Sequence, residues 1–151
     1  MIERIGVIGL GRMGWAVASR FADMEAEVRG WTRSGVDTGR ARAAGFEGVG
    51  ELRDLVASSD VLVLSLFNDA AARDVLARLS ALDLSGRLIV ETSTVSPNVV
   101  RDLVAGIEGA GGALVDAPIS GGPDMVADTV RDLRVSRIGH GINAITSRIK
   151  V

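Results

Sequence analysis

The sequence predicts an α/β protein: a doubly wound parallel sheet in three layers, with helices on both faces. Two observations carry this prediction. Short apolar runs alternate with amphipathic stretches as far as about residue 117, and this alternation requires a parallel sheet with right-handed crossovers. Aromatic residues make up 3% of the chain, whereas Ala, Val, Leu and Gly are plentiful. Such a composition suits strands buried between closely packed helices.

Six strands are expected, each a short apolar run next to turn-forming residues. They cover residues 5–8, 28–31, 46–49, 61–67, 87–92 and 113–117. The third is the weakest of them. The fourth, VLVLSLF, is almost wholly apolar, which indicates a strand covered on both faces.

Five helices are expected between the strands. They cover residues 13–24, 38–44, 51–58, 69–79 and 97–107. The apolar face of the first helix is expected to consist of Met13, Ala16, Val17 and Phe21. Either Asn68 or Asp69 caps the fourth helix, and Pro97 suits the first turn of the fifth.

The overall composition narrows the function classes. A chain of 151 residues has the usual size of one domain. A net charge of -2 and a pI near 5.4 argue against nucleic acid or an anionic membrane as the main partner. Without cysteine and with one histidine, His140, no metal site is expected. Neither a signal peptide nor a membrane span is evident, so we expect a cytoplasmic protein.

The first strand runs directly into a glycine-rich loop. In IGVIGLGRMG, residues 5–14, the glycines Gly9, Gly11 and Gly14 form a GxGxxG motif between a strand and a helix. Gly9 permits a tight turn, Gly11 lets the backbone approach a pyrophosphate, and Gly14 lets helix and strand pack closely. The helix N-terminus then faces the phosphates. This context predicts a dinucleotide site, and the alternative is a glycine-rich turn that binds nothing.

The end of the second strand bears on the choice of dinucleotide. NAD-binding domains usually place an acidic residue there, which binds the ribose 2′-hydroxyl. This chain has WTRS instead, so that Thr32, Arg33 and Ser34 could hold a 2′-phosphate. NADP is therefore the expected cofactor, with NAD second. The alternative is that Arg33 is a solvated loop residue.

Four motifs together resemble the β-hydroxyacid dehydrogenase family. They are GLGRMG (9–14), LSLFND (64–69), ETSTVSP (91–97) and DAPISGGP (116–123), in the order found in that family. The family includes 3-hydroxyisobutyrate dehydrogenase and is related to 6-phosphogluconate dehydrogenase. The resemblance covers residues 2–123 and implies a Rossmann-type dinucleotide-binding domain over 1–123. The remaining residues, 124–151, form an atypical tail in which we expect an extra strand over 132–139 and a short helix.

The resemblance also implies site residues. The dinucleotide would lie against Gly9, Leu10, Gly11, Arg12, Met13 and Gly14. Leu66 and Phe67, at the end of the fourth strand, would lie near the adenosine ribose and the nicotinamide, with Thr94 beside the nicotinamide ribose. A substrate carboxylate would be held by Ser120, Gly121 and Gly122, because two consecutive glycines can direct successive N–H groups at one anion. A loop that binds nothing is the alternative for this last group.

The family transfers a hydride between nicotinamide and a small 3-hydroxy acid or semialdehyde. It uses a lysine from a C-terminal helical domain, and nearly all of that domain is absent from this chain. Lys150 is the candidate replacement, although a surface lysine is the plainer interpretation. Two functions follow: an NADP-dependent oxidoreductase, which would need self-association to rebuild its cleft, or an NADP(H)-binding module or interaction domain without turnover. Exposed apolar surface near the tail predicts weak homo-oligomer formation.

Overall fold

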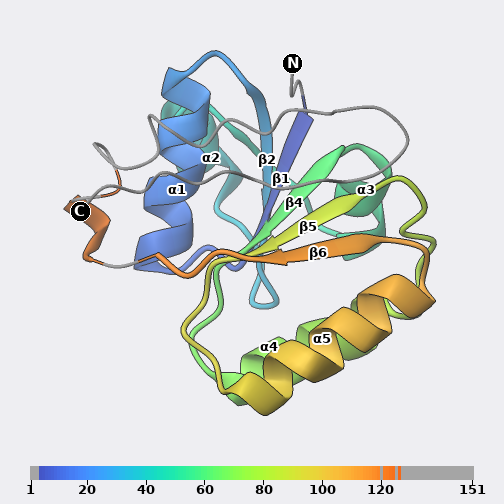
Figure 1. Cartoon of the computed structure of the whole chain (residues 1–151). Helices are drawn as coiled ribbons and strands as arrows, with labels where there is room; N and C mark the ends of the chain where they lie inside the picture. The colour runs from blue at the N-terminus through green and yellow to red at the C-terminus, as the bar shows by residue number, and fades with distance from the viewer. Residues whose placement is uncertain (1–3, 120, 125, 127–151) are drawn as a thin grey trace.

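A computed structural model describes residues 4–119, 121–124 and 126, and it shows three layers of α/β structure (Figure 1). The strands are β1 (Arg4–Ile8), β2 (Glu27–Trp31), β3 (Glu47–Gly48), β4 (Val61–Leu64), β5 (Leu88–Glu91) and β6 (Ala113–Asp116). The helices are α1 (Arg12–Asp23), α2 (Thr38–Ala43), α3 (Leu52–Ala57), α4 (Asp69–Leu79) and α5 (Pro97–Gly109). The predicted doubly wound, Rossmann-type sheet is confirmed.

The strands of the described region form one parallel sheet in the order β3-β2-β1-β4-β5-β6. The direction of winding reverses between β1 and β4, because β1 pairs with both β2 and β4. In this register Ile8 lies beside both Trp31 and Leu64, so the three strands end at the same level. A reversal point of this kind leaves a crevice beyond the carboxyl ends of the strands.

Strand residues alternate between two cores, one on each face of the sheet. The core beneath α1 and α2 takes Ile5, Val7, Val28, Val61, Val63, Leu88 and Val90 from the strands. The core beneath α3, α4 and α5 takes Ile8, Trp31, Leu62, Leu64 and Ile89. Figure 1 shows α4 and α5 side by side on the second face. Each fully buried aliphatic side chain stabilises the fold by roughly 1.5–3 kcal/mol.

The fourth strand is shorter than its sequence predicts. β4 ends at Leu64, whereas the apolar run suggested a strand over 61–67. Ser65 still donates its backbone N–H to the carbonyl oxygen of Ile8 (2.9 Å), but the next N–H, of Leu66, donates to the hydroxyl oxygen of Ser93 (2.7 Å). Leu66 and Phe67 therefore lie in the loop after β4 and do not end the strand.

The helix starts follow the local signals. Asn68 is the cap of α4, because its Oδ1 accepts the backbone N–H of Ala71 (2.9 Å). Asp69 has another role: its carboxylate accepts the N–H of Ser96 (2.9 Å), which ties α4 to the residue that precedes α5. The backbone and the side chain of Ser96 both donate hydrogen bonds to this carboxylate, and these bonds lower the pKa of Asp69. Pro97 occupies the first turn of α5, as predicted.

The buried face of α1 differs slightly from its prediction. The residues that are fully buried are Gly14, Val17, Ala18 and Phe21. Met13 and Ala16 are partly exposed and pack at the margin of the same core. The face is shifted because Gly14 brings that side of the helix directly against the turn after β1.

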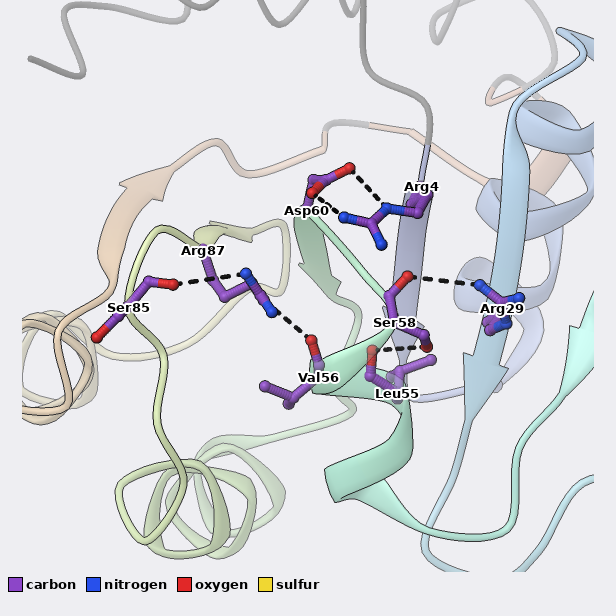
Figure 2. A network of polar contacts seen from close by, with 8 residues as sticks. All are labelled: Arg4, Arg29, Leu55, Val56, Ser58, Asp60, Ser85 and Arg87. Carbon is purple, nitrogen blue, oxygen red and sulfur yellow. Dashed lines mark hydrogen bonds and ion pairs between the residues drawn. The ribbon is translucent and has the colours of Figure 1, made fainter. Parts of the chain in front are cut away.

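Three arginines, at the start of β1, within β2 and just before β5, make polar contacts at and beyond the C-terminal end of α3, as Figure 2 shows. Arg87 donates from Nε to the carbonyl oxygen of Val56 (3.0 Å). Arg29 donates from Nη1 to the carbonyl oxygen of Ser58, just beyond α3 (3.4 Å). Arg4 makes two hydrogen bonds to the carboxylate of Asp60 (3.1 and 2.7 Å). Carbonyl groups at a helix C-terminus lack intrahelical partners, and cations near them are favourable.

The division into a domain over 1–123 and a tail over 124–151 stays a prediction. The expected strand over 132–139 and the expected tail helix lie outside the described residues.

Candidate functional site

A cavity of about 730 Å³ lies at the carboxyl ends of β1, β2, β4 and β5, where the sheet reverses its winding. Its volume is within the usual range for a small-molecule or cofactor site. Every residue with a predicted dinucleotide contact lines it: Gly9, Leu10, Gly11, Arg12, Met13, Gly14, Thr32, Arg33, Ser34, Leu66, Phe67 and Thr94. Residues from four separate loops therefore meet in one place.

The three loop glycines are required for different reasons. Gly9 has φ +95°, and a Cβ there would collide with the backbone oxygen of Ser65. A Cβ on Gly14 would collide with the carbonyl oxygen of Gly9. A Cβ on Gly11 would meet no other residue of the described structure within 4 Å. Protein packing accounts for Gly9 and Gly14, whereas Gly11 keeps space free in the cavity.

That free space fits a pyrophosphate. Gly11 is the N-cap of α1 and has no side chain with which to cap the first N–H groups. No acidic residue lies in the first turn, which begins with Arg12. The N-terminus of a 12-residue helix, with its partial positive charge and unpaired N–H groups, therefore faces the cavity. This arrangement suits a bound anion.

The segment after β2 forms the far wall of the cavity. Trp31 is buried, and its Nε1 donates to the carbonyl oxygen of Gly50 (3.2 Å), which anchors the end of the strand. Arg33 follows with a side chain that is 70% exposed. Its Nη1 lies 3.7 Å from Oδ2 of Asp74, a residue of α4 that also lines the cavity. Arg33, which is predicted to bind the 2′-phosphate, therefore already has an anionic neighbour in Asp74.

The loops after β4 and β5 form the opposite wall. The hydroxyl group of Thr92 donates to the carbonyl oxygen of Leu64 (2.6 Å). Together with the bond between Leu66 and Ser93, this contact joins the two loops. Phe67 is 94% exposed and stands at the rim of the cavity. Thr94 follows Ser93 on the same wall.

A buried carboxyl group lies beneath this wall. Glu91, the last residue of β5, has no exposed surface. Its Oε1 accepts the N–H of Ser93 (2.6 Å), and its Oε2 has no hydrogen-bond partner within the described structure. Burial raises the pKa of Glu91 above its ordinary value, with a smaller upward contribution from Asp116 on β6; the hydrogen bonds from Ser93 act in the opposite direction. Burial therefore disfavours the charged form of this carboxyl group.

The expected substrate-binding residues are only partly placed. Gly121 lines the cavity with Ile119 and Pro123, and Ile119 donates its N–H to the carbonyl oxygen of Thr92 (3.3 Å). Gly122 is described but does not line the cavity. Ser120 and Lys150, like His140, lie outside the described residues. Their roles stay predictions.

Several lining residues were not among the predicted site residues. Ser65 and Ser93 belong to loops whose neighbours were predicted, but their own contacts depend on the pairing of β4 with β5. Ala71, Asp74 and Val75 come from α4. Asp74 and Val75 follow Ala71 by three and four residues, which places the three on one helix face. That spacing was readable from the sequence, but the direction in which the face points was not.

Two further observations concern other classes of site. Over residues 4–119, 121–124 and 126, no group of three or more His, Cys, Asp or Glu side chains could hold a metal ion. None of the helices described here is long and apolar enough to cross a membrane.

The fold and the glycine loop together define a dinucleotide-binding domain of the Rossmann type. Residues 4–130 match the family model described as the NAD binding domain of 6-phosphogluconate dehydrogenase. The chain belongs to this family, whose members are NAD(P)-dependent oxidoreductases. The family resemblance inferred from the four motifs is confirmed.

The relatives of this chain include both a nuclear factor and dehydrogenases. The cytokine-like nuclear factor N-PAC of Danio rerio is 30% identical over 139 residues, which span 83% of this chain and 28% of that protein. The mitochondrial 3-hydroxyisobutyrate dehydrogenase of Drosophila melanogaster is 27% identical over 80% of this chain and 37% of its own. The solved structure of 3-hydroxyisobutyrate dehydrogenase from Mycobacterium tuberculosis with L-serine has a TM-score of 0.78 and 27% identity. It matches 85% of this chain and 44% of its own. The chain thus spans less than half the length of these relatives.

Proposed function

We propose that this chain binds NADP(H) and forms the cofactor-binding part of an oxidoreductase acting on a small 3-hydroxy acid or semialdehyde. The observation that carries the proposal is the open space at Gly11. Gly9 and Gly14 are glycines because neighbouring backbone would collide with a side chain, but nothing in the described protein requires a glycine at position 11. A ligand that approaches the backbone supplies the missing reason.

Each wall of the cavity has a role in this proposal. The nicotinamide, when bound, accepts or supplies a hydride. The N–H groups at the start of α1 hold the pyrophosphate, and Thr94 positions the nicotinamide ribose. Gly121, with Ser120 and Gly122, holds the substrate carboxylate. Lys150 is our candidate for handling the proton on the substrate oxygen. L-serine, named with the Mycobacterium tuberculosis structure, is itself a small 3-hydroxy acid.

The preference for NADP rests on Arg33. It follows β2, lines the cavity, and replaces the carboxylate that NAD-binding domains usually have there. A charge-assisted contact to a 2′-phosphate contributes roughly 1.5–3 kcal/mol, which corresponds to about a 10- to 100-fold preference for NADP.

A binding module without turnover is the second candidate function. The Danio rerio relative is named as a nuclear factor and not as a dehydrogenase, which favours this alternative. Two incubations separate these candidate functions. One combines NADPH with glyoxylate or succinic semialdehyde, and the other combines NADP with 3-hydroxyisobutyrate. Turnover that depends on Gly121 supports the oxidoreductase, whereas binding without turnover supports the module.

Assembly and location complete the proposal. We expect a weak homo-oligomer, which analytical ultracentrifugation would detect as a concentration-dependent sedimentation coefficient. We also expect the cytoplasm as the location, although the Drosophila relative is named as mitochondrial. Imaging of a tagged chain in its own cell would test this.

The substitution Gly11→Ala tests the proposed binding site. A methyl group at this position occupies the space for the pyrophosphate, so NADPH affinity should fall by about tenfold or more. The fold should survive with a loss below roughly 1 kcal/mol, because the backbone of Gly11 (φ -72°, ψ -167°) is accessible to alanine. Isothermal titration calorimetry measures the affinity, and thermal unfolding measures the stability.

Gly109→Ala is the matched control. Gly109 is exposed at the end of α5, and a Cβ there also meets nothing within 4 Å. This variant should bind NADPH as the wild type does. Equal NADPH affinity in Gly11→Ala and Gly109→Ala, with both folded, would contradict the proposed site.

A further inference from the structure

One acidic side chain stands in the wall of the cavity. Among the described residues that line it, Asp74 is the only carboxylate, and Arg12 and Arg33 are the cations. Asp74 comes from α4, whereas Arg33 comes from the segment after β2. The two side chains meet because α4 packs at the carboxyl end of the sheet. Neither the glycine motif nor the residues after β2 assign any task to this carboxylate.

Asp74 has two cationic neighbours, and they differ in strength. Arg78 donates from Nε to Oδ2 of Asp74 (3.2 Å) one turn further along α4. Arg33 lies 3.7 Å from the same oxygen, beyond hydrogen-bond length. The Asp74 side chain is 36% exposed, and that of Arg33 is 70% exposed. Arg78 therefore holds Asp74 on the helix, and Arg33 is the partner that can be withdrawn.

We propose that Asp74 sets the balance between NADP and NAD by competing with the 2′-phosphate for Arg33. The inference rests on the proposed dinucleotide site. A phosphate bound by Arg33 must draw the guanidinium away from Asp74 and lie near a second anion, which costs free energy. NAD has a hydroxyl group at this position and meets no such repulsion. Asp74 thus lowers the ratio of NADP to NAD affinity that Arg33 creates.

The carboxylate of Asp74 also provides a hydrogen-bond acceptor for NAD. Other dinucleotide-binding domains bind the ribose hydroxyl with an acidic residue that follows the second strand. In this chain that position holds Arg33, and α4 supplies a carboxylate to the same wall of the cavity. A single site therefore carries a cation for the phosphate and an anion that can accept a hydrogen bond from a ribose hydroxyl.

The substitution Asp74→Asn tests the competition. Affinities for NADPH and NADH are measured by calorimetry, together with those for adenosine 2′,5′-bisphosphate and 5′-AMP, which report on the phosphate end alone. The ratio of NADPH to NADH affinity should rise about two- to fivefold, the range expected for an exposed ion pair. The ratio of bisphosphate to AMP affinity should rise equally, and both gains should shrink at high salt.

Asp102→Asn is the matched control. Asp102 forms an ion pair with Arg73 between α5 and α4, has a side chain that is 50% exposed, and does not line the cavity. Its loss should leave both ratios unchanged. An unchanged or lower ratio in Asp74→Asn, or the same rise in Asp102→Asn, would overturn the proposal.

The Arg33→Ala background separates this proposal from the proposed function. If the competition acts through Arg33, the rise in both ratios caused by Asp74→Asn should be clearly smaller in that background, and an equal gain in both backgrounds overturns it. A wild type that binds neither dinucleotide refutes the proposed function itself. Undiminished NADPH affinity in Arg33→Ala refutes the assignment of Arg33 and, with it, the role of Asp74.

Discussion

Glu91 shows how one residue beneath the cavity connects the core to the site. Its carboxyl group is fully buried, yet it accepts a hydrogen bond from Ser93, whose own hydroxyl group accepts the N–H of Leu66. The buried group therefore supports two loops that line the cavity. Among the described residues no cation pairs with Glu91. Burial then favours the protonated carboxyl group, and the pKa of Glu91 is shifted upward accordingly.

The stability of the protein should depend on pH through Glu91. The pKa of Glu91 is raised in the folded state, so the folded chain binds this proton more strongly than the unfolded chain. Its contribution is complete below the ordinary value of 4.5 and is lost as pH rises through the folded-state pKa. Glu91→Gln stays neutral and should flatten this decline, as measured by urea unfolding between about pH 4 and pH 8.

Glu108→Gln provides the comparison for this experiment. Glu108 is an exposed glutamate near the end of α5, so its loss should leave the decline of the unfolding free energy with pH in place. Parallel curves for the wild type and Glu91→Gln would show that Glu91 does not titrate differently in the two states.

At the scale of the element, the contact between β1 and α1 depends on the absence of side chains. The helix can begin directly after the strand only because Gly14 lets the first turn of α1 approach the carbonyl oxygen of Gly9. The same approach brings the N-terminus of α1 to the cavity. The glycine loop between β1 and α1 therefore determines both how α1 packs and how its N-terminal N–H groups reach the cavity.

Gly14→Ala should separate packing from binding within this loop. The added methyl group collides with backbone, which cannot move without displacing α1, so a loss of about 1–3 kcal/mol or more is expected. Gly11→Ala, three residues earlier, should retain nearly all of the stability. Thermal and urea unfolding followed by circular dichroism measure both variants. Equal stability of the two would contradict the assigned roles.

At the scale of the whole molecule, the cavity joins parts of the chain that are far apart in sequence. Its walls come from the loops after β1, β2, β4 and β5 and from residues near Gly121. A ligand that touches all of these loops binds the folded state and not the unfolded one. Binding should therefore stabilise the fold as a unit.

NADPH should accordingly raise the melting temperature. At about 100 times the dissociation constant the gain is roughly 2.7 kcal/mol, or about 5–10 °C for a chain of this size. Differential scanning calorimetry would measure the shift. At the same NADPH concentration the shift should be smaller in Gly11→Ala. No shift in the wild type would indicate that the cavity does not take this cofactor.

Local patterns determined much of the fold. The alternation of apolar runs and amphipathic helices placed every strand and helix of the described region to within a few residues, since burial on both faces of a parallel sheet leaves a strong local signal. The GxGxxG spacing identified the strand-to-helix turn, and the residues after β2 indicated the cation at Arg33. All of these signals lie within short segments.

Contacts between distant segments were decided only by the tertiary structure. The end of β4 at Leu64 depends on the hydroxyl group of Ser93, which takes over the hydrogen bond that would have continued the strand. The burial of Glu91 and the approach of Asp74 to Arg33 depend on how β5 and α4 pack. A sequence pattern reports what each segment must bury, but which polar groups meet is decided when the segments come together.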